Sequence, residues 1–157
     1  MTQLAELTTY IEQHVPIRAN ISFYSEMDNI QLTNAAKSLG NGGRRIRVRQ
    51  YDAVLTWEAW PYRLVNPDVL FAIIDSWLVH HANSLRDELA LADPSIDVEV
   101  DDQGDAWLQI TIPLADPIVI VEDVAGDIPY GTKRYRLDKA DIWVADHCNI
   151  HPRTQSD

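Results

Sequence analysis

The sequence predicts an α+β fold, with a mixed, largely antiparallel sheet packed by a long helix and an N-terminal helix. Apolar residues recur at helical spacing in two segments and alternate with polar residues in several others. The two patterns do not alternate along the chain as βαβ units would require. A length of 157 residues, 46% of them hydrophobic, indicates one domain spanning residues 1–157.

The first part of the chain is expected to form a helix, a short strand and a loop. Helical spacing from about Thr2 to Val15, followed by Pro16 as a stop signal, predicts an amphipathic helix. Alternation over Ile17 to Phe23 predicts a short strand. Ser25 to Gly43 is expected to be an exposed, mobile loop that can hold a helical turn around Asn34 to Leu39.

The next segment, Arg44 to Ala59, predicts one long strand with an irregular pattern. A Gly-Asn-Gly-Gly turn precedes it. The apolar phase of the strand flips between Val48 and Tyr51, which a regular period-two strand cannot do. Either a bulge lies there, or the basic half leaves the sheet and meets something else.

A long helix is expected from Asn66 to about Ala90. Asn66 can accept from the first free amides, Pro67 fits the first helical position, and Asp68 complements the helix dipole. The apolar positions form a stripe wide enough to cover one face of a sheet. They are Leu70, Ile73, Ile74, Trp77, Leu78, Leu85 and Leu89.

The second half of the chain is expected to be rich in strands. Ile96 to Val100 and Ala106 to Leu114 flank a tight turn and predict a hairpin. Ile118 to Glu122 predicts a third strand, and Ile142 to Cys148 a fourth, after a loop from Asp123 to Lys139. The helices are expected to pack on one side of the resulting sheet.

Charge and composition exclude several classes of function. The net charge is -11, which opposes broad attraction to nucleic-acid phosphates or to anionic membranes, so neither is an expected partner. The chain starts without a secretory signal pattern and has no run of about 18 apolar residues that would span a bilayer. Its single cysteine, Cys148, fits a reducing compartment, and we expect the protein in the cytoplasm.

The histidines and the cysteine do not predict a metal or catalytic site. His80 and His81 point about 100° apart on a helix, so they cannot both face one metal. His147, Cys148 and His151 form the one Cys/His cluster, but His147 and Cys148 face opposite sides of a strand. No catalytic motif occurs, so the sequence predicts no enzyme, no cofactor and no metal.

Charged residues are distributed unevenly along the chain. Two short clusters are basic, whereas the span from Asp87 to Asp127 contains no Lys or Arg. If the two kinds of surface lie on opposite sides, identical copies can join head to tail, and a closed contact makes a ring. Pairing within the chain, or simple solubilising charge, explains the clusters equally well. The candidate self-association residues are Arg44, Arg45, Arg47, Arg49, Arg134, Arg136, Asp101 and Asp102.

Several strings resemble the tail completion protein R family of contractile-tailed temperate phages. They lie between about residues 45 and 123: YDAVLTWEAWPY, DVLFAIIDSWLVHHAN, the hairpin strands IDVEV and AWLQITIPL, and IVIVED. The resemblance implies a phage tail terminator-like fold and a structural role without catalytic residues. The Gly-Gly-Arg-Arg loop and the part after Asp123 depart from the family pattern.

The resemblance also implies partners and a location. A terminator caps the finished tail tube and offers the surface to which the head joins, and relatives with this fold assemble as hexameric rings. The implied partners are further copies of the chain, the tail tube protein and the head–tail connector proteins. The implied location is the host cytoplasm during assembly and then the virion tail.

A second hypothesis is a small-molecule or peptide binding domain, or an enzyme with an unrecognised site. Its motivation is the five Trp and six Tyr residues, together with histidines on the core helix. It predicts a deep pocket that contains His80 or His81 with a displaced pKa.

Overall fold

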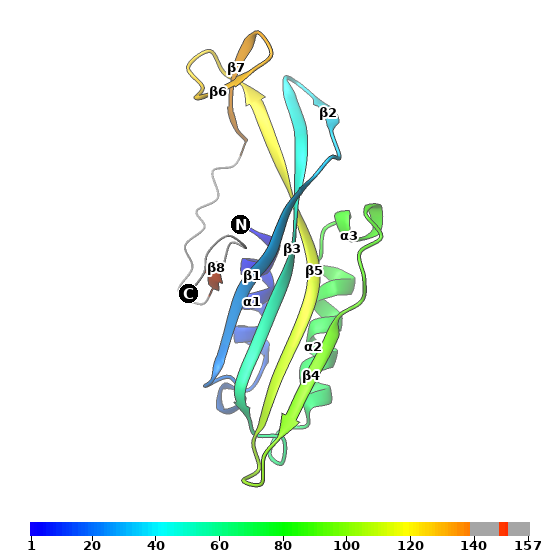
Figure 1. The fold of residues 1–157 in the computed structure, drawn as a ribbon, viewed down its shortest axis with the longest axis vertical. Coiled ribbons are helices and arrows are strands. Elements are labelled where there is room, and N and C mark those ends of the chain that lie inside the picture. Colours follow the sequence, from blue (N-terminus) through cyan, green and yellow to red (C-terminus); the bar gives the residue numbers. More distant parts are fainter. Residues whose placement is uncertain (139–147, 151–157) are drawn as a thin grey trace.

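A long, curled sheet forms the axis of the molecule, and helices cover only part of it (Figure 1). The computed structural model describes residues 1–138 and the backbone of residues 148–150. The helices are α1 (Gln3–His14), α2 (Pro67–His80) and α3 (Leu85–Glu88), with a 3-10 turn at Ile17–Ala19. The strands are β1 (Phe23–Thr33), β2 (Lys37–Gly40), β3 (Gly43–Trp60), β4 (Ser95–Val100), β5 (Ala106–Glu122), β6 (Ile128–Tyr130), β7 (Lys133–Leu137) and β8 (Cys148–Ile150).

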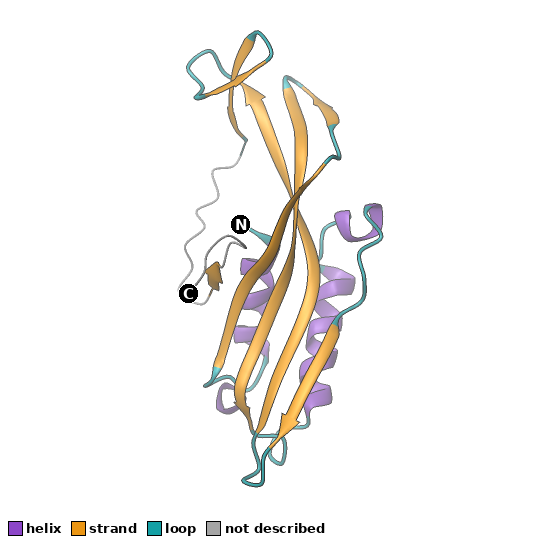
Figure 2. Cartoon of the chain, viewed as in Figure 1, coloured by secondary structure: helices purple, strands orange, loops and turns teal. Residues whose placement is uncertain are grey.

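The strands join into one sheet in the order β6-β7-β5-β3-β1-β8, with β2 paired to β3 and β4 paired to β5 (Figure 2). Within the described part of the chain, every pairing is antiparallel except that of β1 with β8. The predicted α+β class with a largely antiparallel sheet is therefore confirmed.

Helices α1 and α2 pack against the same face of the sheet. Thr2 caps α1, because its Oγ1 accepts a hydrogen bond of 3.1 Å from the amide of Ala5. Asn66 caps α2 in the same way through the amide of Asp68, as predicted. The main core joins both helices to alternate residues of β3 and β5. Full burial of each large side chain there contributes about 1.5–3 kcal/mol.

The prediction of one helix from Asn66 to Ala90 is wrong in its length. Helix α2 ends at His80, and only the short α3 follows. Asn83 lies in the break, where its amide N–H donates to Gln3 Oε1 at 2.8 Å and its Nδ2 donates to the carbonyl of Ala115 at 2.8 Å. These bonds fix Asn83 outside a helix, in keeping with the weak helix propensity of Asn.

Two predictions near the N-terminus are also wrong. Residues 17–23 do not form a strand: Ile17 and Ile21 are 84% and 83% exposed, and the strand starts at Phe23. The expected loop from Ser25 to Gly43 is mostly strand, because β1 continues to Thr33 and β2 follows. Its polar residues are held by backbone pairing with β3, which side-chain patterns do not reveal.

The predicted turn before β3 is confirmed. Gly40, Asn41 and Gly42 connect β2 to β3, and all three have positive φ, at 77°, 49° and 77°. Glycine and asparagine adopt this left-handed region more readily than other residues do.

The phase flip in β3 coincides with an irregularity in the sheet, which was one of the two expected explanations. The pairing of β3 with β5 is regular from Arg47 to Trp57, so β3 does not leave the sheet, but its pairing with β1 shifts register between Asp52 and Gln50. Val48 packs in a second, smaller core with Leu85 and Ala115. Since residues 48 and 51 point to opposite faces, the apolar side changes where this second core begins.

Strand β5 is one continuous strand, although the sequence predicted two. Pro113 and Pro117 lie in the stretch between the last residue paired with β4, Thr111, and the first residue paired with β7, Ile120. A proline there removes no ladder hydrogen bond. The carbonyl of Pro113 instead accepts from the guanidinium of Arg86.

The remaining predictions concern the C-terminal part. The expected loop from Asp123 to Lys139 is wrong in part, because β6 and β7 form a hairpin within it. The predicted strand from Ile142 to Cys148 lies, apart from the backbone of Cys148, outside the described residues. His147 and His151 also lie outside them.

Candidate functional site

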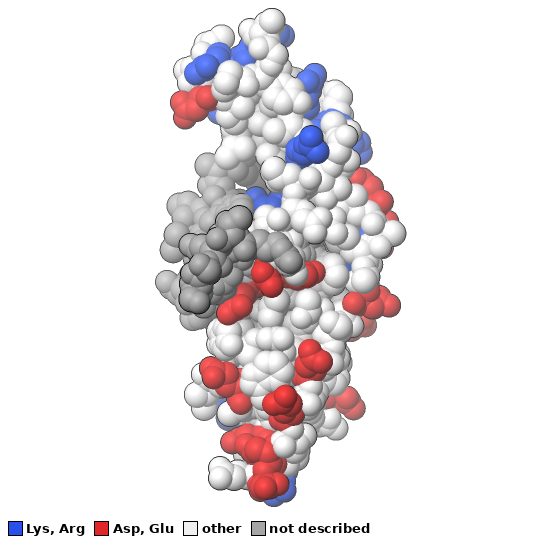
Figure 3. Space-filling model, in the orientation of Figure 1, with Lys and Arg blue, Asp and Glu red and all other residues white. Residues whose placement is uncertain are grey.

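A basic arm projects beyond helices α1 and α2 at one end of the molecule (Figure 1). We define it as β2, β6 and β7 with the adjoining residues 43–47 of β3 and 118–122 of β5. Lys and Arg side chains gather at this end (Figure 3). The basic residues of the arm are Lys37, Arg44, Arg45, Arg47, Lys133, Arg134 and Arg136.

The arm brings together two basic clusters that lie far apart in the sequence. Arg44 pairs across β3 and β5 with Ile120, which in turn pairs with Leu137 of β7. The guanidinium of Arg44 also lies 5.6 Å from the centre of the Tyr130 ring, a cation–π contact. The two clusters therefore form one surface.

Some of the candidate arginines have partners within the chain. Arg45 Nη2 lies 2.7 Å from Glu88 Oε2, and Arg45 Nε donates to the carbonyl of Ala35 at 2.8 Å. Arg136 Nε lies 3.5 Å from Asp123 Oδ2. These two arginines therefore have partners before any second copy approaches.

The other arm residues are more open. Arg44 and Arg47 are exposed. Arg134 is exposed as well, although its Nε donates to the carbonyl of Gly126 at 3.0 Å. Arg44, which also contacts Tyr130, and Arg47 therefore present their charge at the surface.

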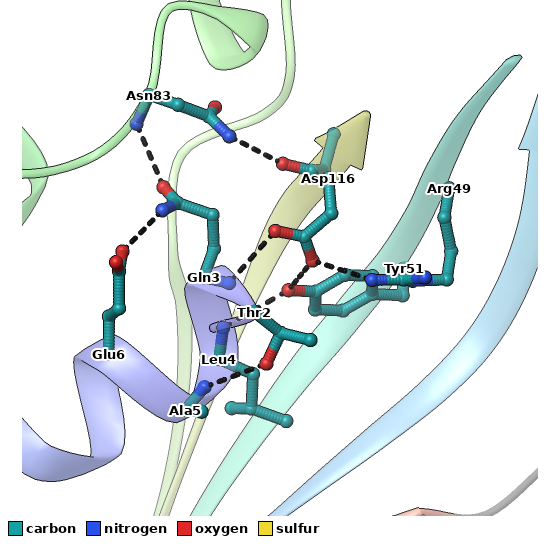
Figure 4. Close-up of polar contacts among 10 residues, drawn as sticks. Thr2, Gln3, Leu4, Ala5, Glu6, Arg49, Tyr51, Asn83 and Asp116 are labelled. Atoms are coloured by element: carbon teal, nitrogen blue, oxygen red, sulfur yellow. Dashed lines mark hydrogen bonds and ion pairs between the residues drawn. The ribbon is translucent and has the colours of Figure 1, made fainter. Parts of the chain in front are cut away.

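Arg49 is buried and does not belong to the exposed surface. Only 8% of it is exposed, and its Nη2 lies 3.4 Å from Asp116 Oδ2 (Figure 4). A buried charge of this kind requires a partner, because removal from water costs several kcal/mol. Arg49 is therefore paired within its own chain.

Asp116 anchors the start of α1 to the sheet. Its Oδ1 accepts from the amide of Gln3 at 2.9 Å, and its Oδ2 accepts from the hydroxyl of Tyr51 at 2.7 Å (Figure 4). The same hydroxyl accepts from the amide of Leu4 at 3.1 Å. Burial, and then the Asp116 carboxylate, raise the pKa of Tyr51 well above its usual value, so the phenol stays protonated.

Sequence reasoning missed this network. Asp116 counted there only as one more acidic residue, and Tyr51 only as an apolar strand position. The one available signal was a carboxylate inside the apolar run that surrounds Pro113 and Pro117. A charge at such a position must find a partner within the fold.

The opposite end of the molecule is acidic. The turn between β4 and β5 carries Asp101 and Asp102, both exposed, and acidic side chains gather around it (Figure 3). Asp101 Oδ1 accepts from the amides of Gln103 and Asp105 at 2.8 and 3.0 Å, which shapes the turn. Asp102 is the freer of the two carboxylates to meet another molecule.

The predicted histidine pair lies at the surface of α2 and beside α1. His80 Nδ1 lies 2.9 Å from the carbonyl of Ser76, and the ring centre of His81 lies 5.2 Å from that of Tyr10. His81 also lines a hollow of about 290 Å³ with Trp77 and Tyr10. In the described residues, no group of three His, Cys, Asp or Glu side chains is placed to hold a metal ion.

No helix in the described part of the chain combines the length and the apolar character that are needed to cross a bilayer.

Comparisons with known proteins identify the family. The P2 phage tail completion protein R (GpR) family matches residues 1–139, so the resemblance seen in residues 45–123 extends over nearly the whole chain. The chain is also 26% identical, over 150 residues, to an uncharacterised 19.2 kDa protein in the rep-hol intergenic region of Haemophilus phage HP1. That match covers 96% of this chain and 90% of the relative. No solved structure matches the chain. The chain belongs to the P2 phage tail completion protein R family, and its general role is in completing the phage tail.

Proposed function

We propose that this protein caps the finished tail tube as a ring of identical copies and provides the surface to which the head joins. Six copies is the number that the resemblance to tail terminators implies. The observation that carries the proposal is the separation of charge along the molecule, with a basic arm at one end and an acidic turn at the other (Figure 3).

Charge separation of this kind favours head-to-tail contacts. The basic arm of one copy attracts the acidic end of the next, whereas two like ends repel each other. Contacts between different surfaces of identical subunits form a closed ring when their rotation closes. Attraction between exposed charges is screened by salt, with a Debye length of about 8 Å at physiological ionic strength.

The ring would present its two flat sides to different partners. One side meets the tail tube protein, and the other meets the head–tail connector proteins. Assembly takes place in the host cytoplasm, and the protein then remains in the virion tail. The alternative of a ligand-binding domain or an enzyme has less support, because it expects a deep pocket at His80 or His81, whereas both histidines are exposed at the surface.

The role is tested by complementation. Cells infected with a phage that lacks this protein are expected to accumulate separate heads and tails. Adding the purified full chain to that lysate should restore infectious particles. Electron microscopy should then place the added protein at the head-proximal end of the tail.

The same assay needs charge-matched variants. Arg44→Glu with Arg47→Glu should abolish the rescue, because both side chains are exposed on the arm. Arg18→Glu, measured against Arg47→Glu alone, reverses one exposed arginine outside the arm and should leave the rescue intact. Joining of heads and tails without the protein would contradict the proposal.

A further inference from the structure

Strand β4 leaves one edge of the sheet open beside helix α2. It pairs with β5 on one side, and no described strand pairs with its other side. All six of its residues, Ser95–Val100, are exposed. An exposed strand edge is a template for another strand, and proteins usually shorten or cover it.

The open edge presents its backbone groups at alternate residues. The amide of Asp101 donates to the carbonyl of Asp105 at 2.9 Å and closes the hairpin. Since the register from Ser95 to Val100 has no irregularity, Asp97 and Glu99 direct their backbone groups toward β5. Ile96, Val98 and Val100 therefore direct theirs outward.

An apolar groove runs between this edge and α2. It has a volume of about 550 Å³ and is lined by Phe71, Leu78 and Val79 of α2 and by Ile96 of β4. Val79 is 67% exposed and Val98 of the strand edge is 50% exposed. A strand added to β4 would place alternate side chains over this groove, which gives it both backbone and apolar contacts.

The charge around the edge selects a basic occupant. Asp97 and Glu99 lie on the strand, and Asp75, Asp87 and Asp93 line the groove. Arg86 also lines it, and its guanidinium donates to the carbonyls of Pro113 and Ala92. The carboxylates outnumber this cation, so the edge favours a strand with positive charge over an acidic strand.

The basic arm of the same chain fits this requirement. Strand β2 pairs with β3 on one side, and no described strand pairs with its other side. It carries exposed Lys37 and Leu39, and Arg44 and Arg47 follow in the adjoining part of β3. The arm therefore offers an open edge, an apolar side chain and positive charge together.

We propose that β2 in the basic arm of one copy pairs with the free edge of β4 in the next copy, so that one sheet continues across subunits. This inference rests on the proposed function, because it assumes that copies associate head to tail. It adds a backbone contact to the proposed attraction between charges, because charge alone fixes neither the register of the two strands nor the distance between the two copies.

The test uses the purified full chain in low salt, with light scattering and amide hydrogen exchange measured over a dilution series. On association, the amides of β4 and β2 should become protected together. Val98→Pro removes an outward N–H without a loss from the β4–β5 ladder, and proline is tolerated on edge strands. It should weaken self-association by about tenfold or more.

Val98→Thr is the matched control, since it keeps both the N–H and the branched shape, and it should associate like the unmodified chain. Association of Val98→Pro at unmodified strength would overturn the inference. So would a monomeric unmodified chain, or protection on association that spares β4. The wild-type exchange data decide the question even if Val98→Pro fails to fold.

Complementation of the phage that lacks this protein separates this inference from the proposed function. Rescue by Val98→Pro would contradict the β4 contact without contradicting the role in the tail. The opposite result is that the unmodified chain associates through β4 in solution but does not rescue the phage. That result would contradict the role in the tail and support the contact.

Discussion

The part of the sheet beneath α1 and α2 and the basic arm are built in different ways. Beneath the helices, alternate residues of β3 and β5 are fully buried in one core with Trp57, Trp60 and Trp77. In the arm, most side chains of β2, β6 and β7 are exposed, and Tyr135 is the buried residue of β7. The helix-covered half therefore has a large buried core of its own, whereas the arm leaves most of its side chains exposed.

The largest expected effect comes from the helix-covered half. Trp57 is fully buried, its ring stacks on Phe23 at 4.6 Å, and its Nε1 donates to Asn20 Oδ1 at 2.9 Å. Trp57→Ala should lower the free energy of unfolding by about 3–5 kcal/mol. Urea denaturation measures this. Leu39→Ala in the arm is the contrast and should change stability little. An equal decrease in the free energy of unfolding for both variants would contradict the difference between the two regions.

The second expected effect tests the buried network that anchors α1. Asp116→Ala leaves the buried charge of Arg49 without this carboxylate and should cost about 3 kcal/mol or more. Tyr51→Phe removes two hydrogen bonds but no charge and should cost about 1–2 kcal/mol. Chemical denaturation of both variants compares them. Equal losses would mean that the ion pair contributes nothing beyond hydrogen bonding.

The raised pKa of Tyr51 gives a further expectation for alkaline solution. Tyr51 ionises at a pH of about 10 in the unfolded chain but stays protonated in the fold to higher pH. Its contribution to stability is therefore complete below pH of about 10 and is lost as pH rises further. Tyr51→Phe should reduce the fall in unfolding free energy between pH 9 and pH 11. An unchanged slope would contradict this.

A smaller and more local effect is expected from the arm. A Cβ on Gly126 would lie 2.0 Å from the carbonyl oxygen of Tyr135, so the β6–β7 hairpin must shift. Gly126→Ala should cost about 1–3 kcal/mol of local stability and speed amide exchange in β7, while exchange in β3 stays slow. Gly131 has a positive φ of 66° but no atom near an added Cβ, whereas Gly126 has the clash without a positive φ. Gly131→Ala therefore measures backbone strain alone, and Gly126→Ala measures the clash. Faster exchange throughout the sheet would show that arm and core unfold together.

The sequence predicted the parts of the fold that local chemistry determines. The cap at Asn66, the glycine turn before β3 and the β4–β5 hairpin depend on neighbouring residues, and the structure has all of them. The continuation of β5 through Pro113 and Pro117 is possible because β3 pairs with one side of this stretch and no described strand pairs with the other. Which strands lie beside it is decided by residues far apart in the sequence, so no local pattern predicts it.

The candidate site was also predictable only where it depends on neighbouring residues. Exposed Arg44 and Arg47, like Asp102, follow from charge and turn patterns. The burial of Arg49 depends on Asp116, which is 67 residues away and reaches it through the β3–β5 register. The arm itself also depends on register, because β2 and β7 meet β3 and β5 only in three dimensions.

The central claim is that opposite ends of the molecule attract each other, and a charge-swap mixture tests it most directly. One variant carries Arg44→Glu and Arg47→Glu, and the other carries Glu99→Lys and Asp102→Lys. Each variant alone has one end whose most exposed charges are reversed and so match the sign of the other end, and light scattering in low salt should find neither assembled. An equal mixture restores complementary ends in both directions and should regain the mass of the unmodified assembly. A mixture that remains dissociated, or single variants that assemble as the unmodified chain does, would contradict the claim.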